Sequence, residues 1–149
     1  RQGLTNMATT VYLSNPALTI NSVNLTDQAT SAVLSFVYES LETTAFGDTA
    51  RKFGGSSVTS LQNNTFEVTL YQSYAASETE ATIYGLVGIQ TTITISPTAA
   101  GLVTPSATEP KYTLTGAYLE SHTPINATLG ELSTITLTFT GGTLTKAVS

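Results

Sequence analysis

Two long strand-like segments flank a glycine-containing loop between Ser31 and Tyr74, and this stretch constrains the fold more than any other. In the second segment, Phe66, Val68 and Leu70 alternate with polar residues, which is typical of a strand with one buried and one exposed face. If the pattern from Val58 to Gln72 formed one strand, it would span about 50 Å, far beyond the usual length of about six residues. We therefore expect a sheet that extends past one compact core.

The first long segment changes the face of its apolar residues partway along. Leu34, Phe36 and Tyr38 share one parity, and the apolar parity then moves to Leu41. A one-residue insertion in a strand reverses the face of every following side chain. The sequence therefore predicts a bulge near Glu39 or Ser40.

Shorter patterns predict the elements around this stretch. A turn at Asn21 and Ser22 predicts a hairpin, and a capping-box spacing at Ser77 and Glu80 predicts a helix from Ser77 to Val87, which we expect to be the only one. Residues 98–110 are rich in proline, alanine and threonine and are expected to form a loop. Alternating apolar residues predict further strands around Ile93 and Ile95, from Tyr112 through Leu114 and Gly116 to Tyr118, and from Ile135 through Leu137 to Phe139.

The composition limits the classes of function. The chain of 149 residues has a net charge of −5 and only five lysines and arginines, so it lacks the basic stripe that tight nucleic-acid binding requires. Threonine fills about one position in five, which favours strands over helices. No run approaches the roughly 18 apolar residues of a membrane helix, so we expect no membrane segment. The length fits one domain over residues 1–149.

Catalytic residues are hard to find, and we predict that the chain is not an enzyme. The chain has no cysteine, and we interpret His122, its only histidine, as an ordinary surface or turn residue. A catalytic triad assembled from distant positions stays open at this stage. Glu39 with Glu42, or Glu78 with Glu80, resemble the carboxylate pairs of glycosidases, but solvated strand-end charges and a helix N-terminus fit them better. We expect no catalytic residue, no cofactor and no bound metal.

Short motifs in a fixed order give the chain a family resemblance. The motif T-T-A-F-G-D-T-A-R-K occupies residues 43–52. The other matching pieces are Leu18 to Asp27, Tyr71 to Ala76, Pro110 to Tyr112, Tyr118 to Pro124, Gly130 to Leu132 and Gly141 to Lys146. In these pieces and their order the sequence resembles the major tail tube proteins of long-tailed (siphovirus-like) bacteriophages. It departs from them in having no tryptophan in the second long strand, and in Ser73, where an aspartate is common.

The resemblance implies a mainly β protein, with an antiparallel β-sandwich or barrel-like tail tube fold and one flanking α-helix from about Ser77 to Val87. It implies a single tail tube domain, with residues 1–10 as a candidate flexible N-terminal arm. Six copies would form a ring, and stacked rings would form a hollow conduit through which double-stranded DNA passes without specific binding. The implied partners are further copies of the chain and the tape-measure, tail-terminator and tail-tip proteins, and the implied location is the tail of the virion, with synthesis in the host cytoplasm.

The resemblance also suggests which residues carry these contacts. The central loop reaches toward the next ring in relatives, so Phe46, Asp48, Arg51, Lys52 and Phe53 are candidates for the contact between rings, with an interaction expected between Asp48 and Arg51. An anionic lumen would repel phosphate and prevent sticking. On that basis, the lumen-facing candidates are Glu39, Glu42, Glu67 and Thr69.

Two other classes of protein fit the same composition. An extracellular β-sandwich binding module or adhesin would explain the threonine content, the acidity and the lack of catalytic motifs, and would be a monomer that binds a glycan. Another phage β-protein, such as a tail-completion or head-decoration subunit, would share much of the tube fold.

Overall fold

The computed structural model describes residues 16–54 and 61–149, so the predicted N-terminal arm and the start of the pattern at Val58 lie outside the described residues. Eight strands in this part of the chain form one antiparallel sheet in the order β2-β1-β5-β6-β7-β4-β3, and β8 also pairs with β6. The strands are β1 (Ala17–Ile20), β2 (Val23–Asn24), β3 (Ala29–Ser35), β4 (Thr65–Tyr71), β5 (Gln90–Ser96), β6 (Lys111–Leu119), β7 (Thr134–Thr140) and β8 (Thr143–Ala147). The mainly β, antiparallel prediction is confirmed.

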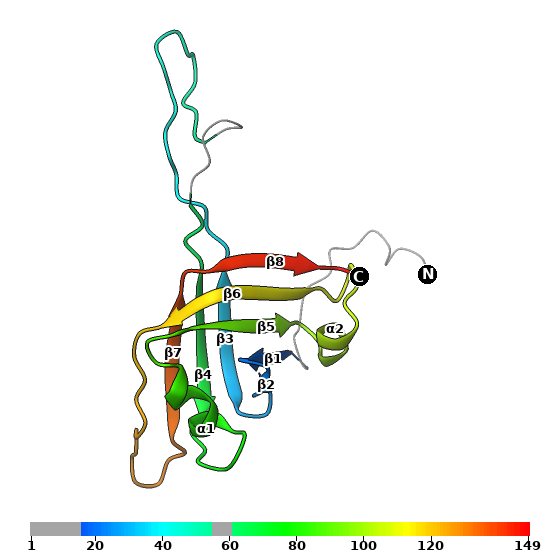
Figure 1. Ribbon diagram of the computed structural model, residues 1–149, viewed down its shortest axis with the longest axis vertical. Helices are drawn as coiled ribbons and strands as arrows, with labels where there is room; N and C mark the ends of the chain where they lie inside the picture. Colours follow the sequence, from blue (N-terminus) through cyan, green and yellow to red (C-terminus); the bar gives the residue numbers. More distant parts are fainter. Residues whose placement is uncertain (1–15, 55–60) are drawn as a thin grey trace.

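The sheet folds over on itself where β6 meets β7. These two strands pair only at Tyr118 with Thr140 and at Leu119 with Phe139. Strands β1, β5, β6 and β8 therefore run crosswise to β3, β4 and β7 (Figure 1). Apolar residues of both parts meet in one buried core, which includes Ile20 and Ile93 of the first part and Phe66 and Phe139 of the second. This is the sandwich-like architecture that the family resemblance implies.

The pattern gave the correct inward face for β4 and β7 but not for all of β6. Phe66, Val68 and Leu70 are fully buried, as predicted. In β6, Leu114 is buried but Tyr118 is 42% exposed, and Ala117 is buried instead. The ladder with β5 shifts by one residue next to Gly116, whose φ is +85°, so the inward parity reverses there.

The helices differ from the prediction in number and in capping. Helix α1 (Thr79–Ile83) continues as a 3₁₀ turn, η2 (Tyr84–Leu86), within the predicted range, but a second short helix, α2 (Ala99–Val103), lies in the expected loop. The predicted capping box does not form, because Ser77 has a φ of +63° and the N-cap is Glu78, without a side-chain cap. Thr98 caps α2 by accepting a hydrogen bond from the Gly101 amide at 2.9 Å. In the described part of the chain, no helix has both the length and the apolar character to cross a membrane.

Beyond β3 and before β4 the chain extends from the body as a long arm, residues 36–64, of which 36–54 and 61–64 are described (Figure 1). Its two sides contact each other at isolated bridges, Tyr38 with Gln62 and Glu42 with Phe53. The predicted bulge near Glu39 or Ser40 is wrong, because regular pairing of β3 ends at Ser35 and the register shift lies between Ala29 and Ser31. Most of the described residues of the arm are exposed.

Candidate assembly surfaces

The face of β3, β4 and β7 that points away from the core is polar and carries few charges. Glu67 of β4 lies between Val33 of β3 and Thr138 of β7, and Thr69 lies between Ser31 and Thr136. The hydroxyls of Thr69 and Thr136 are 3.1 Å apart and hydrogen-bonded. The further residues of this outer face are Ser35, Thr65, Tyr71, Thr134 and Thr140. Glu67 is thus the one charged residue on the outer face of these three strands.

The four lumen-facing candidates separate into two places. Glu67 and Thr69 share the outer face, whereas Glu39 and Glu42 lie on the arm, beyond the end of β3. The Glu42 carboxylate accepts two hydrogen bonds from Arg51, at 2.7 Å from Nη2 and 3.1 Å from Nε. Glu42 is therefore neutralised by a neighbour, while Glu67 is not paired with a base in the described part of the chain.

Strand β3 is an exposed edge strand of the sheet. It is the last strand of the sheet and pairs only with β4 among the described residues. Four of its seven residues are exposed, including Val33 at 54%. Edge strands with free backbone groups associate with other strands unless they are covered.

An apolar groove of about 960 Å³ opens between β3 and the crosswise strands. Its walls include Leu34 and Phe36 on the β3 side, and Leu18, Ile95, Tyr112 and Leu144 on the other. Phe36 is 58% exposed and Val37 beside it is 42% exposed. The core is therefore open on the side where β3 also leaves its backbone unpaired.

The tip of the arm, residues 43–54, is a hydrogen-bonded loop that presents one fully exposed aromatic ring. The Thr43 amide donates to the Lys52 carbonyl at 2.9 Å, and the Gly54 amide donates to the Leu41 carbonyl at 2.8 Å. Phe46 makes no shielding contact and is 107% exposed relative to a reference chain. The arm tip is thus an ordered structure whose most apolar side chain faces solvent.

The arm tip forms two ion pairs, and neither is the predicted pair of Asp48 with Arg51. Asp48 pairs with Lys52 at 2.8 Å, and Arg51 pairs with Glu42, with the guanidinium 5.9 Å from the centre of the Phe53 ring. The expected Asp48 to Arg51 interaction is wrong, because the turn places position 52, four residues on, over the carboxylate. The Lys52 ammonium and the Ala45 amide hold the pKa of Asp48 below its ordinary value of 3.8.

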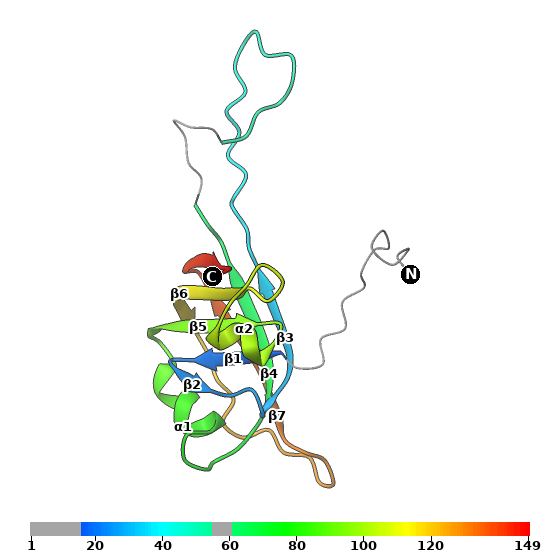
Figure 2. The ribbon, with the colours of Figure 1, turned by 90° about the vertical axis from the view of Figure 1, so that its right-hand side faces the viewer.

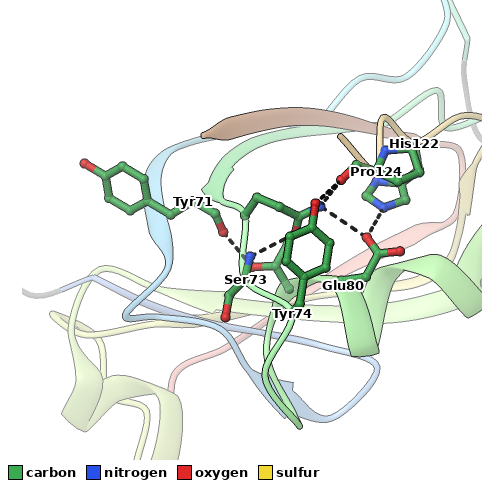
Figure 3. A network of polar contacts seen from close by, with 8 residues as sticks. Tyr71, Ser73, Tyr74, Glu80, His122 and Pro124 are labelled. Atoms are coloured by element: carbon green, nitrogen blue, oxygen red, sulfur yellow. Dashed lines mark hydrogen bonds and ion pairs between the residues drawn. The ribbon is translucent and has the colours of Figure 1, made fainter. Parts of the chain in front are cut away.

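The end of the molecule opposite the arm is built around a polar network that the sequence did not indicate (Figure 3). The side chain of His122 is only 2% exposed, and its Nε2 lies 2.9 Å from Oε1 of Glu80 on α1. Gln72 donates to the same carboxylate oxygen at 3.2 Å and to the Pro124 carbonyl at 2.6 Å, which also accepts from the Tyr74 hydroxyl at 2.8 Å. The side chain of His122 is buried rather than on the surface, although the residue lies in the irregular segment after β6, and it ties residues 120–133 to α1.

The contacts of this network join residues 120–133 to α1. Nε2 of His122 is occupied by Glu80, and no nucleophilic side chain contacts the ring in the described structure. Of the second candidate pair, Glu78 accepts a hydrogen bond from the Ser73 hydroxyl, whereas Glu80 contacts Gln72 and His122. Within residues 16–54 and 61–149, no three histidine, aspartate or glutamate side chains cluster as metal ligands would.

Comparisons with known proteins support the fold and leave the family open. No protein-family model and no curated protein matches the sequence. The cap that terminates the tube of the anti-feeding prophage has a TM-score of 0.64 at 14% identity, over 96% of this chain and 94% of that chain. A chain of the sheath-tube complex of PVC, an extracellular contractile injection system, in its extended state has a TM-score of 0.62 at 12% identity, over 100% and 99%.

A third solved structure belongs to another kind of particle. A chain from the tail of an empty GTA particle, with C6 symmetry, has a TM-score of 0.50 at 11% identity, over 81% of this chain and 83% of that chain. At such identities the likeness establishes the fold alone. The fold is therefore one that occurs in contractile systems as well, and it is not particular to long-tailed phages.

Proposed function

We propose that the chain is a structural subunit of a phage-type tail tube, in which six copies close a ring and rings stack into a hollow conduit for DNA. The main support for the proposal is the free edge of β3. This strand ends the sheet and borders an open apolar groove. A head-to-tail contact between such an edge and a neighbouring copy generates a ring when the rotation closes. The ring would cover the exposed apolar side chains of β3 and complete the open side of the core.

In this arrangement the outer face of β3, β4 and β7 lines the lumen. Its rows of hydroxyls and its single carboxylate, Glu67, would present DNA with a hydrated, weakly negative wall that offers no cation to bind phosphate. Glu39 and Glu42 would border the junction between rings instead. Passage without sticking requires weak interaction, and this face meets that requirement.

The fold comparisons support an assembly of this kind. Structures with the same fold come from a sheath-tube complex and from a tail with C6 symmetry, which is consistent with six copies in a ring. Within the proposal, the tube belongs to the tail of a long-tailed phage virion and contacts tape-measure, tail-terminator and tail-tip proteins. The chain carries out no catalysis in this role.

A concentration series of the purified chain, followed by sedimentation and negative-stain microscopy, tests the proposal. We expect rings at low concentration and hollow tubes at high concentration. Removal of residues 47–55 from the arm should leave rings or monomers without long tubes. A chain that remains monomeric at every concentration, or a deletion variant that grows normal tubes, would contradict the proposal.

A tube-terminating cap is the second candidate function, since one solved structure of the same fold is such a cap. A cap would form one ring and stop, because only one of its ends accepts a further ring. The same microscopy separates the two functions. Closed rings that never lengthen, and that bind to one end of preformed tubes, would indicate the cap.

A further inference from the structure

We propose that residues 7–13 of each free subunit occupy the subunit's own apolar groove and cover the free edge of β3 until a neighbouring copy displaces them. The occupant belongs to the same chain and precedes the described residues. The contact itself does not depend on assembly, whereas its effect on assembly rests on the proposed function. Three observations support it: the place where the described chain begins, the chemistry of the groove and the unpaired edge of β3.

The described chain begins at the wall of the groove. Pro16 and Ala17 line it, together with Leu18 of β1, and Figure 2 shows β1 and β3 from this side of the molecule. The residues before Pro16 therefore start beside the groove. Seven extended residues span about 23 Å, whereas two packed layers of strands lie about 10 Å apart. Residues 7–13 are thus long enough to extend from the β1 side of the groove to β3.

The groove and the segment match in chemistry. The groove has a volume of about 960 Å³, and none of its lining residues is charged. Residues 7–13 read Met-Ala-Thr-Thr-Val-Tyr-Leu, so they carry no charge and end in three large apolar side chains. Docking would remove apolar surface of both the groove and the segment from water, which favours the contact.

Other exposed apolar segments fit the groove less well. The arm tip and residues 120–133 both carry charged side chains, which would lose their water in an uncharged groove. Residues 84–90 are uncharged and hold the exposed Tyr84 and Ile89, but they do not line the groove of their own subunit, so only those of another copy could enter it. A segment of the same chain has the advantage before copies meet, because a short connection holds it at a local concentration of about millimolar.

The edge of β3 offers the segment backbone partners. Among the described residues, β3 pairs with β4 on one side and with no strand on the other. The threonines, valine and tyrosine of residues 9–12 favour strands, and an extended segment that adds to a sheet edge gains main-chain hydrogen bonds. Alternate side chains of such a strand, Val11 and Leu13, would enter the groove. Because a covered edge does not associate with other strands, the docked segment would keep the free subunit monomeric.

A single tryptophan tests the contact, because the chain has none of its own. Leu13→Trp places this reporter in the proposed contact, and Gln2→Trp, outside it, is the matched control. At concentrations where sedimentation shows only monomers, we expect the emission of Leu13→Trp at shorter wavelength than that of Gln2→Trp. Phe36→Asp, at a 58% exposed position on the groove wall, should abolish this difference while circular dichroism still shows a folded β protein.

The outcomes separate this inference from the proposed function. Equal emission of the two tryptophan variants in the monomer, or a difference that Phe36→Asp leaves unchanged, overturns the inference. A shift that occurs only in assembled rings indicates the groove of a neighbouring copy and also overturns it. A chain that stays monomeric at every concentration overturns the proposed function, while the fluorescence of the monomer still decides the inference.

Truncation measures the effect on assembly. Removal of residues 1–13 should lower the concentration at which rings form at least about threefold, because a larger fraction of the subunits then has an open groove. Removal of residues 1–6 is the control and should change that concentration less than about twofold. A higher concentration after the longer truncation would mean that the segment holds copies together, which overturns the inference.

Discussion

The brace between His122 and Glu80 makes a quantitative prediction about Glu80→Ala. The substitution removes the acceptor of the His122 Nε2 at 2.9 Å and one of two acceptors of Gln72, at 3.2 Å. Gln72 keeps the Pro124 carbonyl at 2.6 Å. The imidazole, 2% exposed, cannot reach bulk water to replace its lost partner.

The expected loss of stability follows from these contacts. A hydrogen bond to a charged group contributes about 1.5 to 3 kcal/mol, and a buried polar atom left without a partner costs about 1 to 3 kcal/mol. Because these two quantities describe the same lost contact, we expect the free energy of unfolding to fall by about 2 to 3 kcal/mol. For a chain of this length that corresponds to a Tm lower by about 4 to 12 °C. Alanine favours helices, so α1 itself should not contribute to the loss.

Urea unfolding, followed by circular dichroism, measures the effect. Glu131→Ala, at an exposed glutamate in the braced segment, is the control and should change the free energy of unfolding by less than about 0.5 kcal/mol. The double variant Glu80→Ala with His122→Ala should lose at least about 1 kcal/mol less than the sum of the single variants, since both remove one contact. If Glu80→Ala unfolds at the same urea concentration as Glu131→Ala, the brace does not hold this end together.

Three further predictions concern the other surfaces. Glu67→Lys should leave tubes assembled but slow DNA delivery by reconstituted virions, because in each ring of six the change replaces six carboxylates with six ammonium groups; unchanged delivery kinetics would place this face outside the lumen. Gly142→Ala should lower the free energy of unfolding by more than Gly141→Ala in urea titrations, because both have φ near +80° to +90° but a Cβ at Gly142 would lie 2.7 Å from the Thr115 carbonyl oxygen. Because the pKa of Asp48 is held below 3.8, the arm-tip contact with Lys52 should persist from neutral pH to about 4 and be lost only as the pH falls further, and an NMR titration showing loss near pH 5 would refute it.

The sequence predicted the buried faces of β4 and β7 because apolar and polar residues alternate along a strand that has one buried and one exposed face. Phe66 and Phe139 are at the centre of the core for that reason. The sequence also predicted the hairpin of β1 and β2 correctly, since Asn21 and Ser22 both take the positive φ that such turns require. In β6, by contrast, the shift beside Gly116 depends on a mismatch with β5 that only pairing can reveal.

The contacts of the candidate site were less predictable because they join positions that are distant in sequence or are set by turn geometry. His122 and Glu80 are 42 residues apart, and no local pattern marks either as a partner of the other. Arg51 contacts Glu42 across the arm rather than Asp48, which is nearer in the sequence. The sequence predicted long strands on both sides of the central loop, but β3 and β4 have seven residues each, and the two sides of the arm beyond them meet only at isolated bridges. The long-strand prediction is therefore wrong, because the alternating pattern continues into a segment that no neighbouring strand pairs with regularly.

A reconstruction by electron cryomicroscopy of the assembled chain tests the central claim most directly. We expect six copies in a ring, with the free edge of β3 paired to a strand of the neighbouring copy and with Glu67 and Thr69 facing the hollow centre. A map in which the edge of β3 faces solvent, or in which Glu67 lies on the outside of the particle, would contradict it.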